Sequence, residues 1–369
     1  MKLQLVNDLR ETKVKEIKDI LSDPSGRLFI WGKGVYARVL AGYLGDKGIT
    51  KEPVWVVDDA YYKETEGDDT ISLRRLLKIC GEKDAVVYGI YDYAAFRIMK
   101  EKYSGILKHF YDLHFVVVND RIVDWNRDYV EEHLSLYRKT YELLGDELSR
   151  ITMRSYINAA VVGSFDELYD ECHEDAAYFN ELTEGTKAGI LIDCGAYDGD
   201  SIHDFISVFP AYDSIIAFEP DKKNVAKIHE REKREGIKSL TVYDKGVYSE
   251  TKTLFFEEEG KSSSHLSERG TSRIDVMKID DLDLPADKNL FIKMDIEGSE
   301  LNALKGAAET IKKYHPCLSI CVYHKQEDLI EIPPFINSLV RGRGYEYYLR
   351  YHGTDLAELV FYAIPGGKR

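Results

Sequence analysis

The stretch Leu191–Ser201 reads LIDCGAYDGDS, and it decides the fold of the C-terminal half of the chain. Its first residues are apolar and lead to an acid, which is the pattern of a short buried strand in a parallel sheet. Gly195 and Gly199 then permit the tight turn and the close backbone approach that glycine accommodates most easily. The stretch therefore predicts a strand, a glycine turn and a helix, which together open an α/β domain.

The charge of this turn indicates what it binds. It contains three carboxylates, from Asp193, Asp198 and Asp200. A pyrophosphate would meet like charges there, at a cost of about 1 kcal/mol or more for each close pair even at high dielectric. A ligand that carries an ammonium and a sulfonium is attracted instead, and S-adenosylmethionine has both groups. We therefore expect an S-adenosylmethionine site at this turn.

A further acid favours the same cofactor. Glu219 ends the next expected strand, where its carboxylate can accept hydrogen bonds from both ribose hydroxyls. A glycine turn alone is a weak signal, but an acidic turn in register with a strand-terminal Glu is much more specific. The residues expected to bind the cofactor are Asp193, Gly195, Ala196, Tyr197, Asp198, Gly199, Ser201, Glu219, Pro220 and Asp295.

Strands and helices alternate through the rest of this half, which we assign to a domain of residues 188–369. The expected strands are Gly189–Cys194, Ser214–Phe218, Leu240–Tyr243, Leu290–Met294, Cys317–Val322, Tyr345–Tyr351 and Glu358–Ile364. Five strands with helical crossovers, followed by a hairpin, predict a doubly wound Rossmann-like sheet with an antiparallel last strand.

The N-terminal stretch, residues 1–119, shows the same alternation on a smaller scale. Its expected strands are Arg27–Trp31, Val54–Val57, Ala85–Tyr88 and Phe115–Val118. This pattern predicts a smaller Rossmann-like α/β domain. Residues 120–187 contain no comparable strand, and their apolar side chains recur at helical spacing. We expect a helical connector there that packs on the next domain.

The N-terminal domain has a glycine turn of its own, at Gly32–Ala37. It fits the pattern G-x-G-x-x-A, and Asp58 follows at about the distance expected of a ribose-binding acid. Lys33 and Arg38 make this turn basic, so the helix that follows could hold a phosphate. The turn leaves open a dinucleotide-linked oxidoreductase or a nucleotide-sugar-binding protein. The alternative is a domain that binds no cofactor and serves acceptor recognition or dimerisation, which would give a homo-oligomer.

Several segments of the C-terminal half resemble the FkbM-type methyltransferases. Besides the glycine turn, they are Tyr178–Phe179, Phe218–Pro220, Ile279–Asp281, Lys293–Glu300, Lys305–Ala307 and Val322–Leu329. The resemblance covers roughly residues 178–364. It implies a class I methyltransferase fold, S-adenosylmethionine as cofactor, and O-methylation of a hydroxyl on a small-molecule or carbohydrate-containing acceptor. The N-terminal domain lies outside the resemblance.

Two residues are the expected catalytic groups. Methyl transfer from a sulfonium is an in-line displacement, in which the protein aligns the acceptor and removes its proton. Asp295 ends the fourth expected strand and His324 follows the fifth, so both should lie where this fold places its ligands. Histidine suits a general base because its ordinary pKa is near neutrality.

Other roles are open to the residues around this pair. Asp295, Glu297 and His324 are suitable ligand types for a divalent metal, but we expect the site to hold none. Glu300 also fits an acid at a helix N-terminus, where the dipole stabilises it. The loop Ser262–His265 offers His265 as a second candidate base.

The overall composition disfavours other classes of function. The chain has 65 acidic and 50 basic residues and a net charge of −15, so we expect no nucleic-acid partner. No apolar run approaches the roughly 20 residues needed to span a bilayer, so we expect no membrane association. The five cysteines show no CxxC spacing, which indicates free thiols and a cytoplasmic protein.

Overall fold

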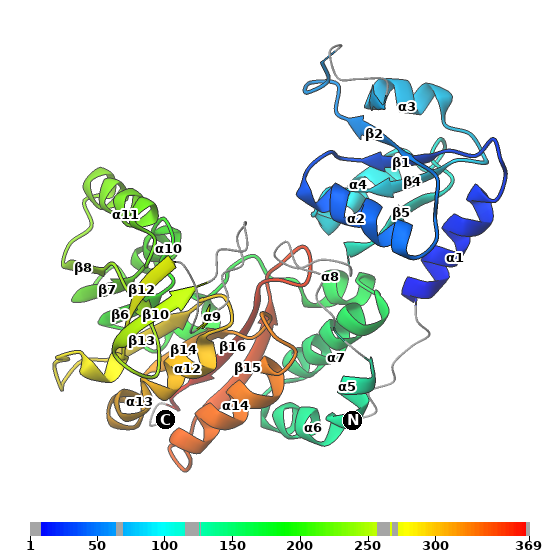
Figure 1. Ribbon diagram of the computed structural model, residues 1–369. Coiled ribbons are helices and arrows are strands. Elements are labelled where there is room, and N and C mark those ends of the chain that lie inside the picture. The colour runs from blue at the N-terminus through cyan, green and yellow to red at the C-terminus, as the bar shows by residue number, and fades with distance from the viewer. Residues whose placement is uncertain are drawn as a thin grey trace.

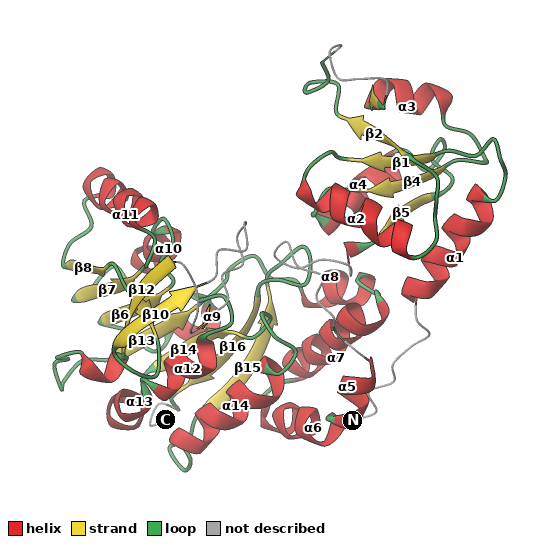
Figure 2. Ribbon diagram, viewed as in Figure 1, coloured by secondary structure: helices red, strands yellow, loops and turns green. Residues whose placement is uncertain are grey.

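The computed structural model describes residues 9–63, 69–114, 125, 127–256, 266–267 and 272–366 (Figure 1). Two parallel α/β sheets occupy the two halves of the chain, as the sequence predicts. Figure 2 shows that the described segments between the last strand of the first sheet and the first strand of the second are helices and loops.

The N-terminal sheet has five parallel strands in the order β3-β2-β1-β4-β5. The strands are β1 (Leu28–Trp31), β2 (Pro53–Val57), β3 (Thr70–Ser72), β4 (Ala85–Tyr88) and β5 (Phe110–Asp112). The helices around them are α1 (Leu9–Leu21), α2 (Val35–Asp46), α3 (Leu73–Ile79) and α4 (Tyr93–Lys102). All residues of β1 and β4 are buried, which explains why both strands are apolar throughout.

The sequence does not predict the edge strands of this sheet. β3 and β5 have three residues each, and strands this short leave no recognisable pattern. The strand expected at Phe115–Val118 lies outside the described residues, and β5, which pairs with β4, ends just before it.

The helices that follow pack on the C-terminal half. They are α5 (Arg127–Glu132), α6 (Leu134–Leu143), α7 (Glu147–Val162), α8 (Asp166–Cys172) and α9 (Glu181–Glu184). Thr140 donates its hydroxyl proton to the carbonyl of Leu329 at 2.7 Å, within the C-terminal half. The buried Arg350 pairs at 2.6 Å with Asp146, the residue that caps α7. These contacts place α6 and α7 on the C-terminal half, where the sequence predicts a helical connector.

The C-terminal sheet has the strand order β15-β16-β14-β13-β6-β7-β8, and β16 alone runs antiparallel to its neighbours. Its strands are β6 (Ile190–Cys194), β7 (Ser214–Phe218), β8 (Leu240–Tyr243), β13 (Leu290–Met294), β14 (Cys317–Cys321), β15 (Glu346–Tyr351) and β16 (Leu359–Ile364). The accompanying helices are α10 (Asp200–Val208), α11 (Lys222–Glu235), α12 (Glu300–Lys305), α13 (Ala308–Tyr314) and α14 (Asp328–Leu339). This is the doubly wound sheet with an antiparallel strand that the sequence predicts.

The C-terminal half also contains a four-stranded sheet, in the order β11-β10-β12-β9, which the sequence does not predict. Its strands are β9 (Gly246–Val247), β10 (Lys252–Phe256), β11 (Leu266–Ser267) and β12 (Ser272–Met277). Two of these strands have only two residues, too few for an alternating pattern. The loop Ser262–His265, with its candidate base His265, lies outside the described residues.

The N-terminal sheet contacts the rest of the chain through α4. The backbone N–H of Tyr93 donates to the carbonyl of Thr354, in the turn between β15 and β16, at 3.0 Å. The hydroxyl of Tyr93 donates to Asp166 at 2.6 Å, and Arg97 pairs with Asp170 in α8. Within the part of the chain that the structure describes, no helix is both long and apolar enough to cross a membrane.

Candidate active site

The turn after β6 is held by a buried ion pair. Asp193 is fully buried, and its carboxylate lies 3.2 Å from Nζ of Lys293. The Ser201 hydroxyl donates to the other Asp193 oxygen at 2.5 Å, and the lysine donates to the carbonyl of Gly195 at 2.7 Å. Burial acts to lower the pKa of Lys293, but the charges of Asp193 and Asp295 outweigh it and raise that pKa. Asp193 and Ser201 therefore shape the turn from inside.

Gly195 is required by a close approach between two turns. Its φ is +80°, and a Cβ at this position would lie 1.8 Å from the carbonyl oxygen of Asp295. The N–H of Asp295 also donates to the carbonyl of Cys194 at 3.1 Å. The turn after β6 and the turn after β13, which the sequence assigns to cofactor and catalysis, are thus in direct backbone contact.

Glu219 lies just after the carboxyl end of β7 and is 7% exposed. Its carboxylate accepts hydrogen bonds from the N–H groups of Tyr197 at 3.0 Å and of Asp221 at 2.8 Å. Burial raises the pKa of Glu219, against the opposite effect of these two hydrogen bonds. Each carboxylate oxygen has a second lone pair, so Glu219 can anchor the glycine turn and still accept a hydrogen bond from a ligand. Pro220 follows it directly.

The glycine turn is less negative than its sequence suggests. Asp198 pairs with Arg231 at 3.2 Å, just as Asp193 pairs with Lys293. Two of the three carboxylates on which the sequence argument depends therefore have cationic partners within the protein.

The remaining residues expected to bind the cofactor lie in the same turn. Ala196 is fully buried, whereas Tyr197 is 55% exposed and has a φ of +46°. Gly199, with a φ of +86°, is the N-cap residue of α10, and no side chain caps this helix. The turn therefore presents one exposed aromatic ring and an uncapped helix N-terminus.

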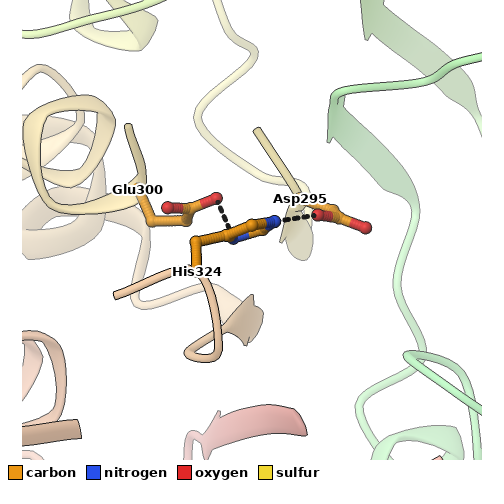
Figure 3. A group of neighbouring side chains, drawn as sticks. All are labelled: Asp295, Glu300 and His324. Carbon is orange, nitrogen blue, oxygen red and sulfur yellow. Dashed lines mark ion pairs between the residues drawn. The ribbon is translucent and has the colours of Figure 1, made fainter. Parts of the chain in front are cut away.

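A histidine lies between two carboxylates at the ends of β13 and β14 (Figure 3). Nε2 of His324 is 3.4 Å from Oδ1 of Asp295, and Nδ1 is 3.1 Å from Oε1 of Glu300. The side chains of His324 and Glu300 are buried, and that of Asp295 is 24% exposed. Glu297 lies farther out, with Oε2 3.7 Å from Nε2. The structure thus brings the two expected catalytic residues together and adds Glu300 to them.

The surrounding charges keep His324 protonated at neutral pH. Burial acts to lower its pKa, but Glu300 above all, and then Asp295 and Glu297, raise the pKa to about 10. Burial acts to raise the pKa of Glu300, yet the positive charge of His324 lowers it. The near-neutral pKa from which the sequence argument starts therefore does not apply to His324 in this environment.

Glu300 also has the helix-terminal role that the sequence suggests. Its Oε1 accepts hydrogen bonds from the N–H groups of Ile296 at 2.9 Å and of Gly298 at 3.3 Å. The same oxygen faces His324, so a single buried carboxylate fixes both the turn after β13 and the orientation of the imidazole.

The same side chains are of the types that bind metal ions. Single ligand atoms of Asp295, Glu300 and His324 lie within 4.8 Å of one another. A histidine that binds a metal through one ring nitrogen commonly directs the other to a carboxylate, and here each nitrogen of His324 faces one. That the site holds no metal stays a prediction. The geometry is that of a Glu–His–Asp chain of ion pairs.

Two tyrosines, which the sequence argument does not assign to the site, complete the surroundings of Asp295. The hydroxyl of Tyr178 donates to Oδ2 at 3.1 Å, and that of Tyr323 donates to Oδ1 at 3.3 Å. Tyr178 precedes Asp295 by 117 residues, so no local spacing could reveal this contact. The one available signal is that Tyr178 belongs to a segment similar to the FkbM-type proteins.

The comparison with protein families gives one match. Residues 193–347 match the family model described as the methyltransferase FkbM domain. This segment contains the glycine turn, Glu219 and the Glu–His–Asp chain. A comparison with curated proteins found no match.

Solved structures resemble the chain to different extents. Methyltransferase FkbM from Methylobacillus flagellatus has a TM-score of 0.71 and 23% identity, over 97% of this chain and 98% of that chain. At this identity the similarity shows the fold, and it includes the N-terminal sheet. The O-methyltransferase TomG from Streptomyces achromogenes has a TM-score of 0.35 and 10% identity, over 66% of this chain and 97% of that one. The latter score is too low to support an argument.

Proposed function

The C-terminal half of the chain belongs to the FkbM methyltransferase family, and from this premise we propose an S-adenosylmethionine-dependent O-methyltransferase. Its acceptor is a hydroxyl group of a small-molecule or carbohydrate-containing compound. The observation that carries the proposal is the Glu300–His324–Asp295 chain, which lies against the glycine turn through the contact between Gly195 and Asp295. A hydroxyl loses its proton as it is methylated, and this chain ends in a partly exposed carboxylate that can accept a proton.

The residues at the ends of β6 and β7 fit the proposed cofactor. The free lone pairs of Glu219 suit ribose hydroxyls, and the exposed ring of Tyr197 lies in the same turn. Ala196, Gly199 and Pro220 would border the bound molecule. When bound, S-adenosylmethionine supplies an electrophilic methyl group. Its positive charge suits a site whose acids, with Asp198 and Asp193 already paired, lie mainly around Asp295.

The proton acceptor in this proposal is Asp295. Its side chain is the most exposed of the three in the Glu300–His324–Asp295 chain, and hydrogen bonds from Tyr178 and Tyr323 fix its carboxylate. The protonated His324 stabilises the negative charge of Asp295 before an acceptor binds, and Glu300 holds the imidazole in place. His324 is therefore a positioning and electrostatic group rather than the first base.

The test is methyl transfer by the full chain from S-adenosylmethionine labelled in its methyl group to a panel of glycosides, alcohols and phenols. We expect a labelled methyl ether, identified by NMR. Asp295→Asn should lower kcat about 100-fold or more, because general base catalysis is worth about that much. Calorimetry should show that this variant still binds S-adenosylmethionine, with an affinity lowered by no more than the loss of one charge near the sulfonium, so that kcat can be compared at saturating cofactor.

Glu309→Gln, a substitution of an exposed acid in α13, is the matched control and should leave both quantities unchanged. Labelled product methylated on nitrogen or carbon would contradict the proposal. So would an Asp295→Asn variant with full activity.

We also propose that the protein acts in the cytoplasm without a nucleic-acid or membrane partner. The net charge of −15 and the five free cysteines support this proposal. A homo-oligomer formed through the N-terminal domain stays a prediction, which sedimentation of the full chain and of a variant altered in that domain would test.

A further inference from the structure

Glu358, in the turn between β15 and β16, faces the same site from another side. The N–H of Val322 donates to the carbonyl of Leu359 at 2.9 Å, which places the start of β16 beside the end of β14. Oε2 of Glu358 lies 3.5 Å from the hydroxyl of Tyr178, and Asp295 lies 3.1 Å from that hydroxyl. Two carboxylates therefore flank one tyrosine hydroxyl.

The carboxylate of Glu358 lacks an adequate partner. A tyrosine hydroxyl carries one proton, and Asp295 is nearer to it than Glu358 is. Within the described ranges, no other donor or cation lies at hydrogen-bonding or ion-pairing distance from this carboxylate. Burial and the charge of Asp295 raise the pKa of Glu358 to about 7, although the charges of Lys293 and His324 act to lower it. A largely buried acid whose one hydrogen bond is long and shared with Asp295 is costly to the fold, and a ligand that donates a hydrogen bond to it would offset that cost.

The backbone around this carboxylate is also unusual. Glu358 has a φ of +59°, and Tyr178 and Glu297 have φ values of +58° and +55°. Residues with side chains seldom adopt this left-handed region, and strained backbone of this kind clusters at functional sites. Three such residues surround Asp295, so the strain is concentrated where the chemistry is proposed.

The strand order indicates which ligand Glu358 meets. Across the sheet the strands follow the order β16-β14-β13-β6-β7. Glu219 and the glycine turn lie at the ends of β7 and β6, Asp295 lies at the end of β13, and Glu358 lies two strands farther on. Glu358 is thus on the opposite side of Asp295 from the proposed ribose site, which is the side left for the acceptor.

We propose that Glu358 binds a second hydroxyl of the acceptor, next to the hydroxyl whose proton passes to Asp295. The acceptor is then polyhydroxylated, with neighbouring hydroxyl groups such as those of a sugar ring. This inference rests on the proposed O-methyltransferase function. Two carboxylates around one tyrosine hydroxyl can accept hydrogen bonds from two adjacent hydroxyls, which a monohydroxylated acceptor would satisfy only in part.

The experiment measures methyl transfer by the full chain to paired probes: methyl glycopyranosides with their monodeoxy analogues, and trans-1,2-cyclohexanediol with cyclohexanol. The wild type should favour the diol-bearing member by about 10-fold to 100-fold in kcat/KM, as expected for a hydrogen bond to a charged group. Glu358→Gln should lose this preference and leave the affinity for S-adenosylmethionine unchanged. Glu346→Gln, an exposed acid of the same hairpin, should keep the preference.

Thermal unfolding provides a readout that needs no acceptor. Glu358→Gln should keep or raise the Tm, because it removes a buried charge whose one hydrogen bond is long and shared with Asp295. A lower Tm would mean that the carboxylate stabilises the fold, and it would overturn the inference. A weaker affinity for S-adenosylmethionine in this variant would overturn it as well.

The transfer experiment separates this inference from the function on which it rests. Equal transfer to diol and monohydroxyl probes contradicts the role of Glu358 and leaves the O-methyltransferase function intact. Methyl transfer to none of these hydroxyl probes contradicts both.

Discussion

Both halves of the chain contain a strand, a glycine turn and a helix, but glycine is needed in the two turns for different structural reasons. At Gly195, a positive φ and the carbonyl of Asp295 at 1.8 Å exclude any side chain. Gly34 has a φ of −75°, and nothing lies within 4 Å of a Cβ placed there. The tight position in the N-terminal turn is Gly32, where a Cβ would lie 2.5 Å from the carbonyl of Gly89.

The charged residues at the two turns also differ in their structural role. At the C-terminal turn, Asp193 is buried against Lys293, so the acid belongs to the framework. At the N-terminal turn, Lys33 is partly exposed and donates to the hydroxyl of Thr70 at 2.8 Å. A glycine pattern therefore predicts a local shape, whereas the neighbouring strands decide what that shape can bind.

The largest difference between the turns should appear when alanine replaces glycine. Gly195→Ala combines a clash with backbone and a left-handed φ, so we expect a loss of about 4 kcal/mol or more in the free energy of unfolding. Gly34→Ala should cost about 1 kcal/mol or less, the price of a poorer helix cap. Urea unfolding followed by circular dichroism measures both. Equal losses would show that the turns are equivalent after all.

Substituting the lysine of each turn should give the next largest difference. Lys293→Met leaves the buried Asp193 without its cation, which should cost about 3 kcal/mol. Lys33→Met should cost less than about 1 kcal/mol, because Lys33 is partly exposed and its hydrogen bond to Thr70 can be replaced by water. The double variant Lys293→Met/Asp193→Asn should recover much of the first loss. If it recovers nothing, the ion pair is not the cause.

Cofactor affinity gives a smaller but more specific contrast. Glu219→Gln should weaken binding of S-adenosylmethionine about 10-fold to 100-fold, since a charged acceptor is replaced by a neutral amide. Asp58→Asn, the corresponding change in the N-terminal domain, should leave this affinity unchanged. Calorimetry of the full chain measures both. Tight binding of a nicotinamide dinucleotide that Gly34→Trp abolishes would instead favour the oxidoreductase alternative.

The smallest of the expected differences between the two halves lies in how their stability depends on pH. Burial raises the pKa of Asp328 to about 8 and that of Glu358 to about 7, so the folded C-terminal half binds more protons than its unfolded chain. Its stability should therefore fall as the pH rises from about 4, the unfolded pKa of these carboxyls, to about 8. His324, with its raised pKa, acts in the same direction.

The N-terminal half should respond in the opposite direction. Burial acts to raise the pKa of Asp84, but the Arg27 ion pair at 2.7 Å and backbone hydrogen bonds lower it. The stability that Asp84 contributes is present above its unfolded pKa of about 4 and is lost as the pH falls below it. Hydrogen exchange, corrected for intrinsic rates and read separately for β1 and β14, measures both halves. Parallel changes in the two strands would contradict this assignment.

The large sheet could be predicted from the sequence because its central strands are buried on both faces. β6, β13 and β14 are fully buried, so each reads as a continuous apolar run bounded by turn residues. The four-stranded sheet β9–β12 could not be predicted in this way, because its shortest strands are defined by their partners rather than by their own residues.

Only part of the candidate site could be predicted from the sequence. Asp295 and His324 follow predicted strands, so their meeting at one edge of the sheet could be anticipated. The contact of Tyr178 with Glu358 spans 180 residues, and no local pattern encodes it. Counting acids overstated the negative charge of the glycine turn, because its cationic partners Lys293 and Arg231 come from other elements.

The hydrogen bond from the N–H of Tyr93 to the carbonyl of Thr354 limits how this protein can be recombined. It ties the N-terminal domain to the turn that carries Glu358, so the two halves are not interchangeable modules. A chimera with a foreign N-terminal domain would keep Glu300, His324 and Asp295. The foreign domain would have to supply a donor for the carbonyl of Thr354. Without that donor, the turn that carries Glu358 loses an anchor, and the proposed acceptor site would change although none of its residues has been substituted.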